Sequence, residues 1–317
     1  MAIVTIVIAV YNPNITWLKK QLSSINNQTF KDIEIIICDD CPQNYTDKNI
    51  FYKTLSNFKP KIFRNKNNLG SNKTFELMTK FAAGKYIAYC DQDDIWQNNK
   101  IAKLVEALEN SNALLAYSDA QIINENDEKI YDSLKDYSKR TKFYSGKNLY
   151  EKLLVSNFIT GCTMMVKSDI AKKSIPFEKT MVHDHYLALY CSIFGQIIFV
   201  DEKLIEYRRH KKNQTGILNG IQTKKDYLEK RILLTKKRLK NLRRRFSDIS
   251  FFINKLSEIE KWNHFREIWW QKFNMPALKN LWRMRNYNKS WTMFEIFSAR
   301  FPQFLFKICI KILCRSK

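Results

Sequence analysis

Three carboxylates crowd into four positions of the stretch YCDQDDIW, where Asp91, Asp93 and Asp94 follow an apolar run. Like charges this close repel one another, so a folded chain tolerates them best with a cation between them. Carboxylate oxygens suit Mg²⁺ and Mn²⁺, and such ions usually complete their shells with water and substrate phosphates. The spacing therefore points to a metal–diphosphate site with Asp91 and Asp93 as ligands. The alternative is a solvated loop whose Asp residues cap a helix beginning near Asn98 or Asn99.

The elements that would position this cluster alternate between strands and helices. Apolar, β-branched runs predict buried strands over residues 3–12, 33–40, 60–65 and 85–94. Apolar positions at helical spacing predict helices over residues 15–25, 72–82 and 99–111. This alternation is typical of an α/β fold with a mainly parallel sheet, in which ligands bind beyond the carboxyl ends of the strands. The polar clusters at those ends are Tyr11–Asn12, Asp39–Asp40 and Asp91–Asp94.

The next part of the chain is less regular. Residues 118–150 are polar with weak periodicity, which predicts a loop-rich insertion. Further strands are expected over residues 157–168 and 195–210, with a helix between them that carries the stretch HDHYLAL.

Composition indicates the cellular compartment of this protein and the kinds of partner that it can bind. Residues 1–202 carry 25 Lys and Arg against 23 Asp and Glu, whereas residues 203–317 carry 29 against 8. The first part has the balance of an ordinary cytosolic enzyme, and the last third is expected to meet an anionic surface. Most of the seven cysteines are expected to be reduced and buried. The apolar start lacks the features of a signal peptide, and no apolar run is long enough to span a bilayer.

A long helical segment occupies much of this last third. Residues 222–275 contain no Gly or Pro, and an apolar seam recurs at heptad steps from residue 228 to residue 256. One interpretation is a long helix, or a hairpin broken near Ser247, that packs on the rest of the chain. The other is a coiled coil that forms a homo-oligomer through residues 228–256.

Two partners compete for the basic region. A cationic stripe of Lys307, Lys311 and Arg315 recurs through the apolar stretch FPQFLFKICIKILCRSK, as in helices that lie in a membrane interface. Five of the seven Trp also lie in this third, and Trp favours such interfaces. The alternative is a nucleic-acid-binding protein or enzyme. Because no nucleic-acid motif is recognisable, an anionic membrane surface is the expected partner and nucleic acid is not; a solvated helical face is a third option.

Several stretches together resemble one enzyme family. VTIVIAVYNPN, DIEIIICDD, NKNNLGSNKTFELMTKFAAG and KYIAYCDQDDIW follow one another as in the donor half of family 2 glycosyltransferases with the GT-A fold. CDQDDIW is similar to the bacterial rhamnosyltransferase-like branch that builds O-antigen, capsule and other surface polysaccharides. FITGCTMMVK, HDHYLAL and LIEYRRHKKNQTG resemble its acceptor half, so the resemblance covers about residues 1–216. It implies a Rossmann-like, mainly parallel sheet with flanking helices, followed by a helical C-terminal extension.

The resemblance implies a set of nucleoside-binding residues. They are Ala9, Tyr11, Asn12, Asp39, Asp40, Asn68 and Gly70. Asp39 or Asp40 would accept a hydrogen bond from the uracil or thymine N3–H, and Gly70 would let the backbone come close. The alternatives are turn capping by Asp40 and a plain turn at residues 68–70.

The resemblance also implies Mn²⁺ or Mg²⁺ as the cofactor. The implied ligands are Asp93, Asp91 and His210, although a structural role is the alternative for His210. The residues implied near the diphosphate and the sugar are Asp91, Asp94, Trp96, Arg208 and Arg209. For Trp96, a buried anchor under the loop is the alternative to stacking on a sugar.

On the acceptor side, Asp184 is the implied catalytic base. The acidic pair usual in the family is His183–Asp184 in this chain. Asp184 would take the proton of the acceptor hydroxyl as that hydroxyl attacks the anomeric carbon. His183 would tune Asp184 or contact the acceptor, and Gly161 would help to shape the acceptor side. A helix cap is the alternative role for Asp184, and the two roles are compatible.

These inferences define a metal-dependent, inverting glycosyltransferase. Residues 1–216 would form the catalytic domain, with a nucleotide-sugar half at 1–117 and an acceptor half at 118–216, and residues 217–317 a basic, helical, membrane-associating region. The donor would be dTDP-rhamnose or a UDP-hexose, and the acceptor a hydroxyl of a lipid-linked, lipopolysaccharide or capsule glycan. The expected location is peripheral, on the inner face of the bacterial cytoplasmic membrane.

Overall fold

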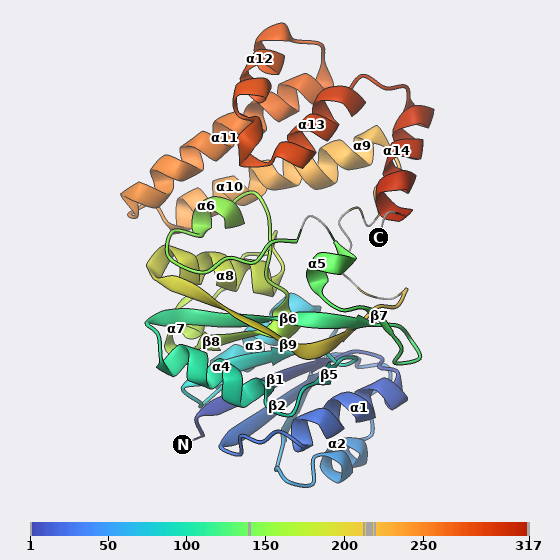
Figure 1. Ribbon diagram of the computed structural model, residues 1–317, viewed down its shortest axis with the longest axis vertical. Coiled ribbons are helices and arrows are strands. Elements are labelled where there is room, and N and C mark those ends of the chain that lie inside the picture. Colours follow the sequence, from blue (N-terminus) through green and yellow to red (C-terminus); the bar gives the residue numbers. More distant parts are fainter. Residues whose placement is uncertain (1, 139–140, 212, 214–217, 219, 316–317) are drawn as a thin grey trace. The chain divides into compact units, whose positions relative to one another are not determined.

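The computed structural model describes residues 2–138, 141–211, 213, 218 and 220–315 (Figure 1). The chain forms two compact units, one of Met1–Leu149 with Phe158–Lys211 and one of Tyr150–Asn157 with Lys212–Lys317. The expected domain boundary between residues 216 and 217 lies outside the described residues. The assignment of a catalytic and a membrane-associating domain stays a prediction.

A mixed sheet, nine-stranded over the described residues, forms the centre of the first unit, with the order β3-β2-β1-β4-β8-β6-β9-β5 and with β7 paired to β6. Four strands run parallel: β1 (Val4–Val10), β2 (Ile33–Asp39), β3 (Lys61–Arg64) and β4 (Tyr86–Cys90). A second parallel pair is formed by β6 (Ala113–Ile123) and β9 (Gln196–Arg208). The antiparallel members are β5 (Ile95–Trp96), β7 (Lys129–Tyr131) and β8 (Met164–Lys167). The predicted α/β fold with a mainly parallel sheet is confirmed.

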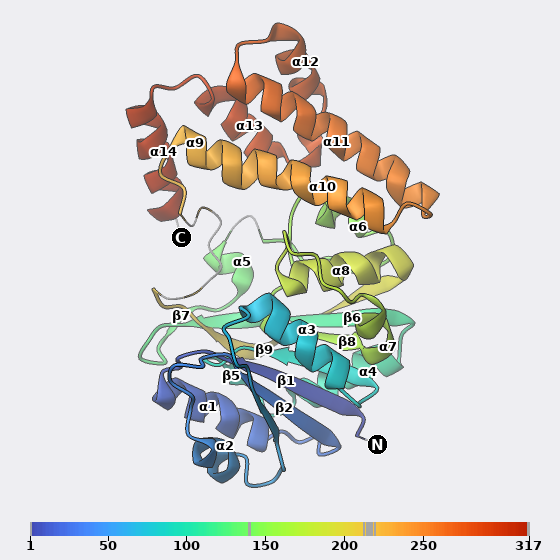
Figure 2. The same ribbon diagram turned by 180° about the vertical axis from the view of Figure 1, so that it is seen from behind.

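Helices cover both faces of this sheet (Figures 1 and 2). One face carries α1 (Ile15–Asn26) and α4 (Lys100–Glu109), whose apolar sides pack with β1 in one buried cluster. The other carries α3 (Ser71–Phe81), with α7 (Ser168–Lys173) and α8 (His183–Phe194) packed against it. The shorter helical segments of this unit are α2 (Lys48–Thr54), α5 (Leu134–Tyr137) and the 3-10 turn Gly161–Thr163.

Local sequence explains where these elements begin and which side they bury. The side chain of Asn14 caps α1 by accepting hydrogen bonds from the backbone N–H groups of Thr16 and Trp17. β1 is apolar and buried along almost its whole length, as expected for a central parallel strand. The predicted inner face of the helix after the acidic cluster is buried; its residues are Ile101, Leu104, Val105 and Leu108.

The prediction of a loop-rich insertion over residues 118–150 is wrong for its first part. β6 continues to Ile123, and a hairpin leads from it to β7. Two polar residues of this strand, Ser118 and Asp119, are buried and hydrogen-bonded inside the protein. Asp119 accepts bonds from the backbone N–H groups of Ala120 and Leu134 and from the Ser133 hydroxyl. Because these residues are polar, the sequence pattern did not indicate a strand here, and the strands that pair with it lie far away in the sequence.

The second unit is helical. Its elements are α6 (Tyr150–Leu153), α9 (Lys224–Tyr227), a π-helical turn (Leu228–Leu233), α10 (Leu234–Arg245), α11 (Ser250–Gln271), α12 (Met275–Arg283), a 3-10 turn (Arg285–Tyr287), α13 (Lys289–Ser298) and α14 (Gln303–Arg315). The chain turns back between α10 and α11, as the alternative of a hairpin broken near Ser247 has it, and the packing of this hairpin on the rest of the chain stays a prediction. The seam residues Ile232, Leu239, Leu242, Phe246 and Leu256 are buried. A homo-oligomer through residues 228–256 stays a prediction.

A buried ion pair joins α11 to α13. Arg266 donates two hydrogen bonds to the carboxylate of Glu295, from Nε at 2.7 Å and from a terminal nitrogen at 2.5 Å. The Tyr227 hydroxyl donates a third at 2.8 Å, so α9 is tied to the same carboxylate. Both charged side chains are almost fully buried, and the Arg266 guanidinium lies over the ring of Trp262. This network fixes how the three helices pack.

Two expectations about the whole chain can be compared with the described residues. None of the described helices combines the length and the apolar character needed to cross a bilayer. Six cysteines are unpaired thiols, and five of them are buried: Cys38, Cys41, Cys90, Cys162 and Cys191. The expectation of reduced, mostly buried cysteines is confirmed for these residues.

Candidate active site

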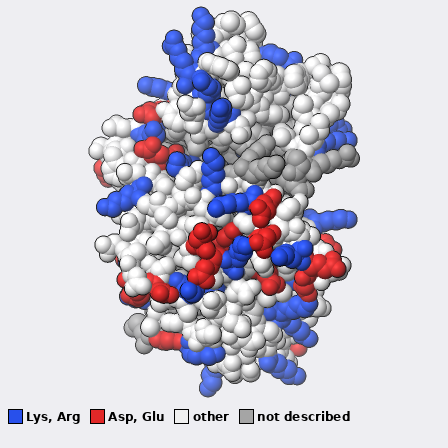
Figure 3. Space-filling view, in the orientation of Figure 1, with Lys and Arg blue, Asp and Glu red and all other residues white. Residues whose placement is uncertain are grey.

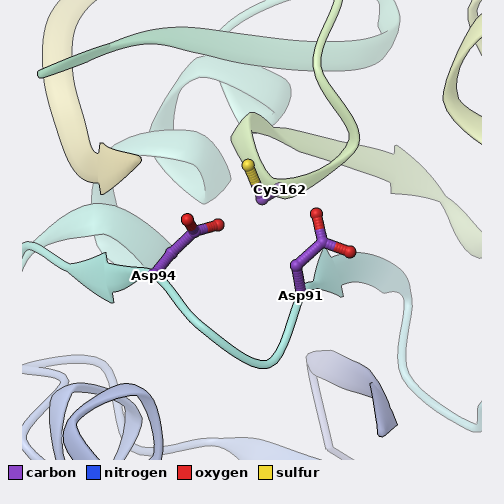
Figure 4. A group of neighbouring side chains, drawn as sticks. All are labelled: Asp91, Asp94 and Cys162. Atoms are coloured by element: carbon purple, nitrogen blue, oxygen red, sulfur yellow. The ribbon is translucent and has the colours of Figure 1, made fainter. Parts of the chain in front are cut away.

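The acidic loop, defined as residues 91–94, leaves the carboxyl end of β4, beside the end of β1. The carboxylates of Asp91 and Asp94 face the Cys162 thiol (Figure 4), and one ligand atom from each residue lies within 4.8 Å of the others. Asp91 is partly exposed, whereas Asp94 and Cys162 are buried. This arrangement is a group that could hold a metal ion.

Burial and mutual repulsion disfavour the ionised forms of the carboxyl groups in this loop. Burial and the negative charges of Asp93 and Asp184 raise the pKa of Asp91 to about 7. Burial and the charges of Asp93 and Asp91 raise the pKa of Asp94 well above the usual range of an Asp. A divalent cation would reverse both effects, because it stabilises ionised carboxylates.

The donor atoms of the cluster suit a hard cation. Asp94 Oδ2 is buried and has no hydrogen-bond partner among the described residues, so it is free to coordinate. Burial raises the pKa of the Cys162 thiol well above its ordinary value, which leaves the two carboxylates as the better ligands. The residues therefore fit Mn²⁺ or Mg²⁺.

Asp93 has a different neighbour. Its Oδ2 lies 2.6 Å from His210 Nε2, and the His210 ring packs 5.0 Å from that of Trp17. The structure thus divides the predicted metal ligands, because Asp93 lies with His210 while Asp91 lies with Asp94. Ligation of a metal by any of them stays a prediction.

Arg208 holds the acidic loop from β9. Its backbone N–H donates to Asp94 Oδ1 at 2.9 Å, and its Nε donates to the Asp93 carbonyl at 2.7 Å. The buried guanidinium also forms an ion pair with Asp127 at 2.5 Å. Arg209 instead places its guanidinium over the ring of Tyr137. Arg208 therefore shapes the loop, and contact of either arginine with a diphosphate stays a prediction.

Gln92, which was not among the predicted site residues, joins the turn after β1 to the acidic loop by hydrogen bonds. The Gln92 side chain accepts a hydrogen bond from the Tyr11 N–H at 2.8 Å and donates one to the Tyr11 carbonyl at 3.1 Å. Asn12 has a positive φ of 40°, and the Tyr11 side chain is 49% exposed. Ala9, the third predicted residue here, is partly buried in β1. In the sequence, only the position of Gln92 between Asp91 and Asp93 could have drawn attention to this residue.

Asp39 and Asp40 organise the loops after β2. Asp39 is fully buried and accepts from the backbone N–H groups of Cys41 and Thr46. Asp40 accepts from the side chain of Asn65 at 2.7 Å and from the N–H groups of residues 69 and 70, both at 2.8 Å. Both carboxylates thus have turn-forming roles, and their contact with a base stays a prediction.

The turn before α3 depends on Gly70. Its φ of +76° lies in the left-handed region, where Gly has no steric penalty. Asn68 Oδ1 accepts a hydrogen bond from the Gly70 N–H at 3.0 Å. Leu69, beside it, is 47% exposed. These residues lie together with Asp40, as the predicted nucleoside set requires.

Trp96 is buried, with 2% of its surface exposed. Its backbone N–H donates to the Ser24 hydroxyl at 3.0 Å, which ties β5 to α1. This geometry matches a buried anchor under the loop, which was one of the two alternatives for Trp96.

Asp184 lies in the first turn of α8. Its Oδ2 accepts from the Gly161 N–H at 3.0 Å, and its Oδ1 accepts from the His185 N–H at 2.5 Å. Gly161 is followed in the chain by Cys162, whose thiol lies beside the carboxylates of Asp91 and Asp94, and the negative charge of Asp184 also helps to raise the pKa of Asp91. The structure therefore brings the candidate base and the candidate metal ligands together.

His183 is enclosed by aromatic rings. Its ring centroid lies 4.1 Å from that of Phe75 and 5.4 Å from that of Tyr89. Burial lowers the pKa of His183 to about 3, so the imidazole is neutral at physiological pH. A Cβ added at Gly161 would lie 2.7 Å from His183 Nε2, so this glycine is needed for the close approach.

A separate pocket of about 440 Å³ contains none of the predicted site residues. It is lined by Gln97, Asn99, Asp119, Gln121, Asp201, Glu202, Lys203 and Leu204. Figure 3 shows acidic side chains gathered over β6 and β9 on this face, with Lys and Arg among them. Ion pairs join Lys203 to Asp132 and Lys103 to Glu202. Among the carboxylates of this lining, Glu202 therefore has a lysine partner.

The arrangement at the strand ends can perform two linked tasks. The acidic loop can hold a divalent cation, and such a cation binds diphosphates. Asp184, fixed by two backbone N–H groups, can accept a proton from a hydroxyl. These are the requirements for transferring a group from a diphosphate to an alcohol.

Comparison with known proteins points to one family. The profile of Glycosyl transferase family 2 matches residues 5–174. The chain is 31% identical over 229 residues to an uncharacterized glycosyltransferase of Methanocaldococcus jannaschii, covering 71% of this chain and 76% of that one. It is 26% identical over 187 residues to the Escherichia coli UDP-Glc:alpha-D-GlcNAc-diphosphoundecaprenol beta-1,3-glucosyltransferase WfgD, covering 59% of this chain and 68% of that one.

Solved structures share the fold. S. aureus TarS 1-349 in complex with UDP-GlcNAc superposes with a TM-score of 0.55 at 15% identity, covering 93% of this chain and 84% of that one. Against the longer S. aureus TarS chain the TM-score is also 0.55, and the match spans 54% of that chain. At this identity the likeness concerns the fold alone.

Proposed function

The chain belongs to glycosyl transferase family 2, and from this membership we propose that it moves a sugar from a nucleotide diphosphate sugar to a hydroxyl of a lipid-linked glycan, with inversion. The observation that carries the proposal is the convergence of the acidic loop with Asp184: Asp91 and Asp94 lie beside Cys162, and the N–H of the preceding Gly161 donates to Asp184. The membership makes the protein a glycosyltransferase; the donor, the acceptor and the roles of single residues are proposals.

The acidic loop binds the donor diphosphate in this proposal. Asp91 and Asp94 would hold Mn²⁺ or Mg²⁺, with Asp93 and His210 beside them. When bound, the cation supplies positive charge that neutralises the leaving diphosphate. Gln92 and Arg208 keep the loop in one shape, so little rearrangement is needed when the donor arrives.

Asp184 acts as the general base. The acceptor hydroxyl gives its proton to the Asp184 carboxylate while its oxygen bonds to the anomeric carbon. The bond from that carbon to the diphosphate breaks, and the nucleoside diphosphate leaves. One displacement inverts the anomeric centre. The N–H groups of Gly161 and His185 orient the carboxylate throughout.

A UDP-hexose is the donor that the relatives favour. WfgD and a second E. coli relative, WfaP, carry names that describe transfer of glucose from UDP-glucose to a diphosphoundecaprenol-linked sugar. The rhamnosyltransferase-like resemblance makes dTDP-rhamnose the competing donor.

A thermal-shift screen tests the donor. UDP-glucose with Mn²⁺ is expected to raise the unfolding temperature, because a ligand at 100 times its Kd stabilises the native state by about 2.7 kcal/mol. A larger shift with dTDP-rhamnose would reassign the donor. Absence of a shift with every nucleotide sugar, with or without metal, would contradict the proposed binding of a nucleotide sugar. ADP-ribose serves as a control diphosphate.

Membrane association through the second unit is part of the proposal. α14 buries Phe306 and Ile310, while Phe304, Ile308 and Ile312 are 64%, 49% and 59% exposed. Lys307 and Lys311 are exposed beside them, and the side chain of Arg315 lies outside the described residues. An apolar face with flanking lysines suits the interface of an anionic bilayer, where a lipid-linked acceptor is found.

The double variant Phe304→Ser/Ile308→Ser is expected to bind anionic vesicles at least about tenfold more weakly, since burying each of these side chains contributes about 1.5–3 kcal/mol. Flotation with phosphatidylglycerol vesicles measures this. Ile130→Ser is the matched control, because Ile130 is also exposed but lies in β7. Equal flotation of all three proteins would contradict the role of α14. Retention on DNA instead of vesicles would favour the nucleic-acid alternative.

A further inference from the structure

Lys100 occupies a position that is unfavourable for a lysine. It is the first residue of α4 and is fully buried. The helix macrodipole places partial positive charge at that end, so a cation there is destabilised. Burial of an ammonium group adds a desolvation penalty, and burial lowers the pKa of Lys100 to about 8. Helix stability alone therefore does not account for this residue.

The contacts of Lys100 are specific. Its ammonium donates a hydrogen bond to the carbonyl of Cys162 and lies 3.4 Å from the ring centroid of Trp96. The negative charges of Asp94 and Asp91 favour its protonated form. Lys100 thus joins the segment that follows the acidic loop to a turn more than 60 residues further along the chain.

That turn, Gly161–Thr163, also holds the candidate base. The Gly161 N–H donates to Asp184 Oδ2, one residue before the carbonyl that Lys100 contacts. Both the N–H and the hydroxyl of Thr163 donate to the carbonyl of residue 160, so the turn is internally braced. A displacement of the Cys162 carbonyl would therefore also move the Gly161 N–H that orients Asp184.

We propose that Lys100 is a positioning residue, which sets the place of Asp184 relative to the acidic loop through the turn Gly161–Thr163. The inference rests on the proposed role of Asp184 as base. Lys100 itself touches neither donor nor acceptor; it acts by holding the turn that orients the carboxylate.

Lys100→Met tests this, with release of nucleoside diphosphate as the measure of turnover. The variant is expected to lower kcat about 10²-fold, because a misplacement of about 1 Å has an effect of that size. The KM for the donor and the thermal shift with UDP and Mn²⁺ should remain those of the wild type. Lys103→Met is the matched control, because Lys103 lies one turn along the same helix, is partly exposed and pairs with Glu202; it should keep wild-type kcat.

A double variant distinguishes positioning from a general structural effect. If Lys100 acts through Asp184, Lys100→Met/Asp184→Asn is no slower than Asp184→Asn alone, whereas independent effects multiply. Multiplied losses, or wild-type kcat in Lys100→Met, would overturn the inference. If Lys100→Met does not fold, Lys100→Gln, which keeps a polar donor, carries the same comparisons. Wild-type turnover in Asp184→Asn would instead count against the proposed function itself.

Discussion

Replacement of Asp184 by Asn is expected to lower the rate of sugar transfer about 10³-fold while the donor still binds. A positioned general base contributes about 10²- to 10⁴-fold, and an amide cannot take the hydroxyl proton. The side chain keeps nearly the same volume, so the fold of α8 should be retained. Initial rates of nucleoside diphosphate release, and the thermal shift with UDP-glucose and Mn²⁺, measure the two properties separately.

Asp169→Asn is the matched control for this experiment. Asp169 lies in the first turn of α7 as Asp184 lies in the first turn of α8, but it is exposed. It should keep wild-type turnover, because it is exposed in the first turn of α7 and has no part in the proposed proton transfer. Turnover near the wild-type rate in Asp184→Asn would show that the proton goes elsewhere.

Removal of divalent metal is expected to have an effect at least as large. Charge neutralisation of a leaving diphosphate contributes several kcal/mol, so chelation should lower transfer by about 10³-fold or more, and Mn²⁺ or Mg²⁺ should restore it. Without the cation, burial and mutual repulsion favour the protonated forms of Asp91 and Asp94, and nothing at the acidic loop neutralises the diphosphate. Rates measured across a metal titration after dialysis against EDTA provide the test.

Single replacements in the acidic loop sharpen this test. Asp91→Asn and Asp94→Asn should need more metal for half-maximal rate, and Asp93→Ala should lose transfer while the protein stays folded. Asp201→Asn removes an exposed carboxylate of β9 and should behave as the wild type. Full activity in EDTA, or in Asp93→Ala, would refute the corresponding metal assignment.

Local patterns were sufficient to predict much of the fold. The apolar run of β1 and the inner face of α4 report burial directly, so their positions could be read from the sequence. The end of β6 could not, because Asp119 is polar and yet satisfied by Ser133 and Leu134, which only the folded chain brings to it. When a strand's polar residues are satisfied by hydrogen-bond partners distant in the sequence, the strand shows no regular alternation of apolar and polar residues.

The candidate site likewise contains residues that could be predicted from the sequence and residues whose roles only the folded chain reveals. Carboxylates at strand ends stand out, which is why the acidic loop was predicted from its residues, whereas the role of Asp184 was predicted from the resemblance to family 2 glycosyltransferases. Gln92, Lys100 and Asn65 did not stand out, because amides and lysines are common on surfaces and their roles here depend on partners 81, 62 and 25 residues away. The residues that shape such a site are harder to find than those that would perform the chemistry.

The buried pair of Arg266 and Glu295 limits how this protein can evolve. Loss of either partner would strand the other charge among tryptophan and tyrosine rings, at about 3–5 kcal/mol. That is a large fraction of the stability of an ordinary domain. Mutational drift at these two positions therefore has to be concerted: descendants keep both charges, or exchange both for an apolar couple of similar volume.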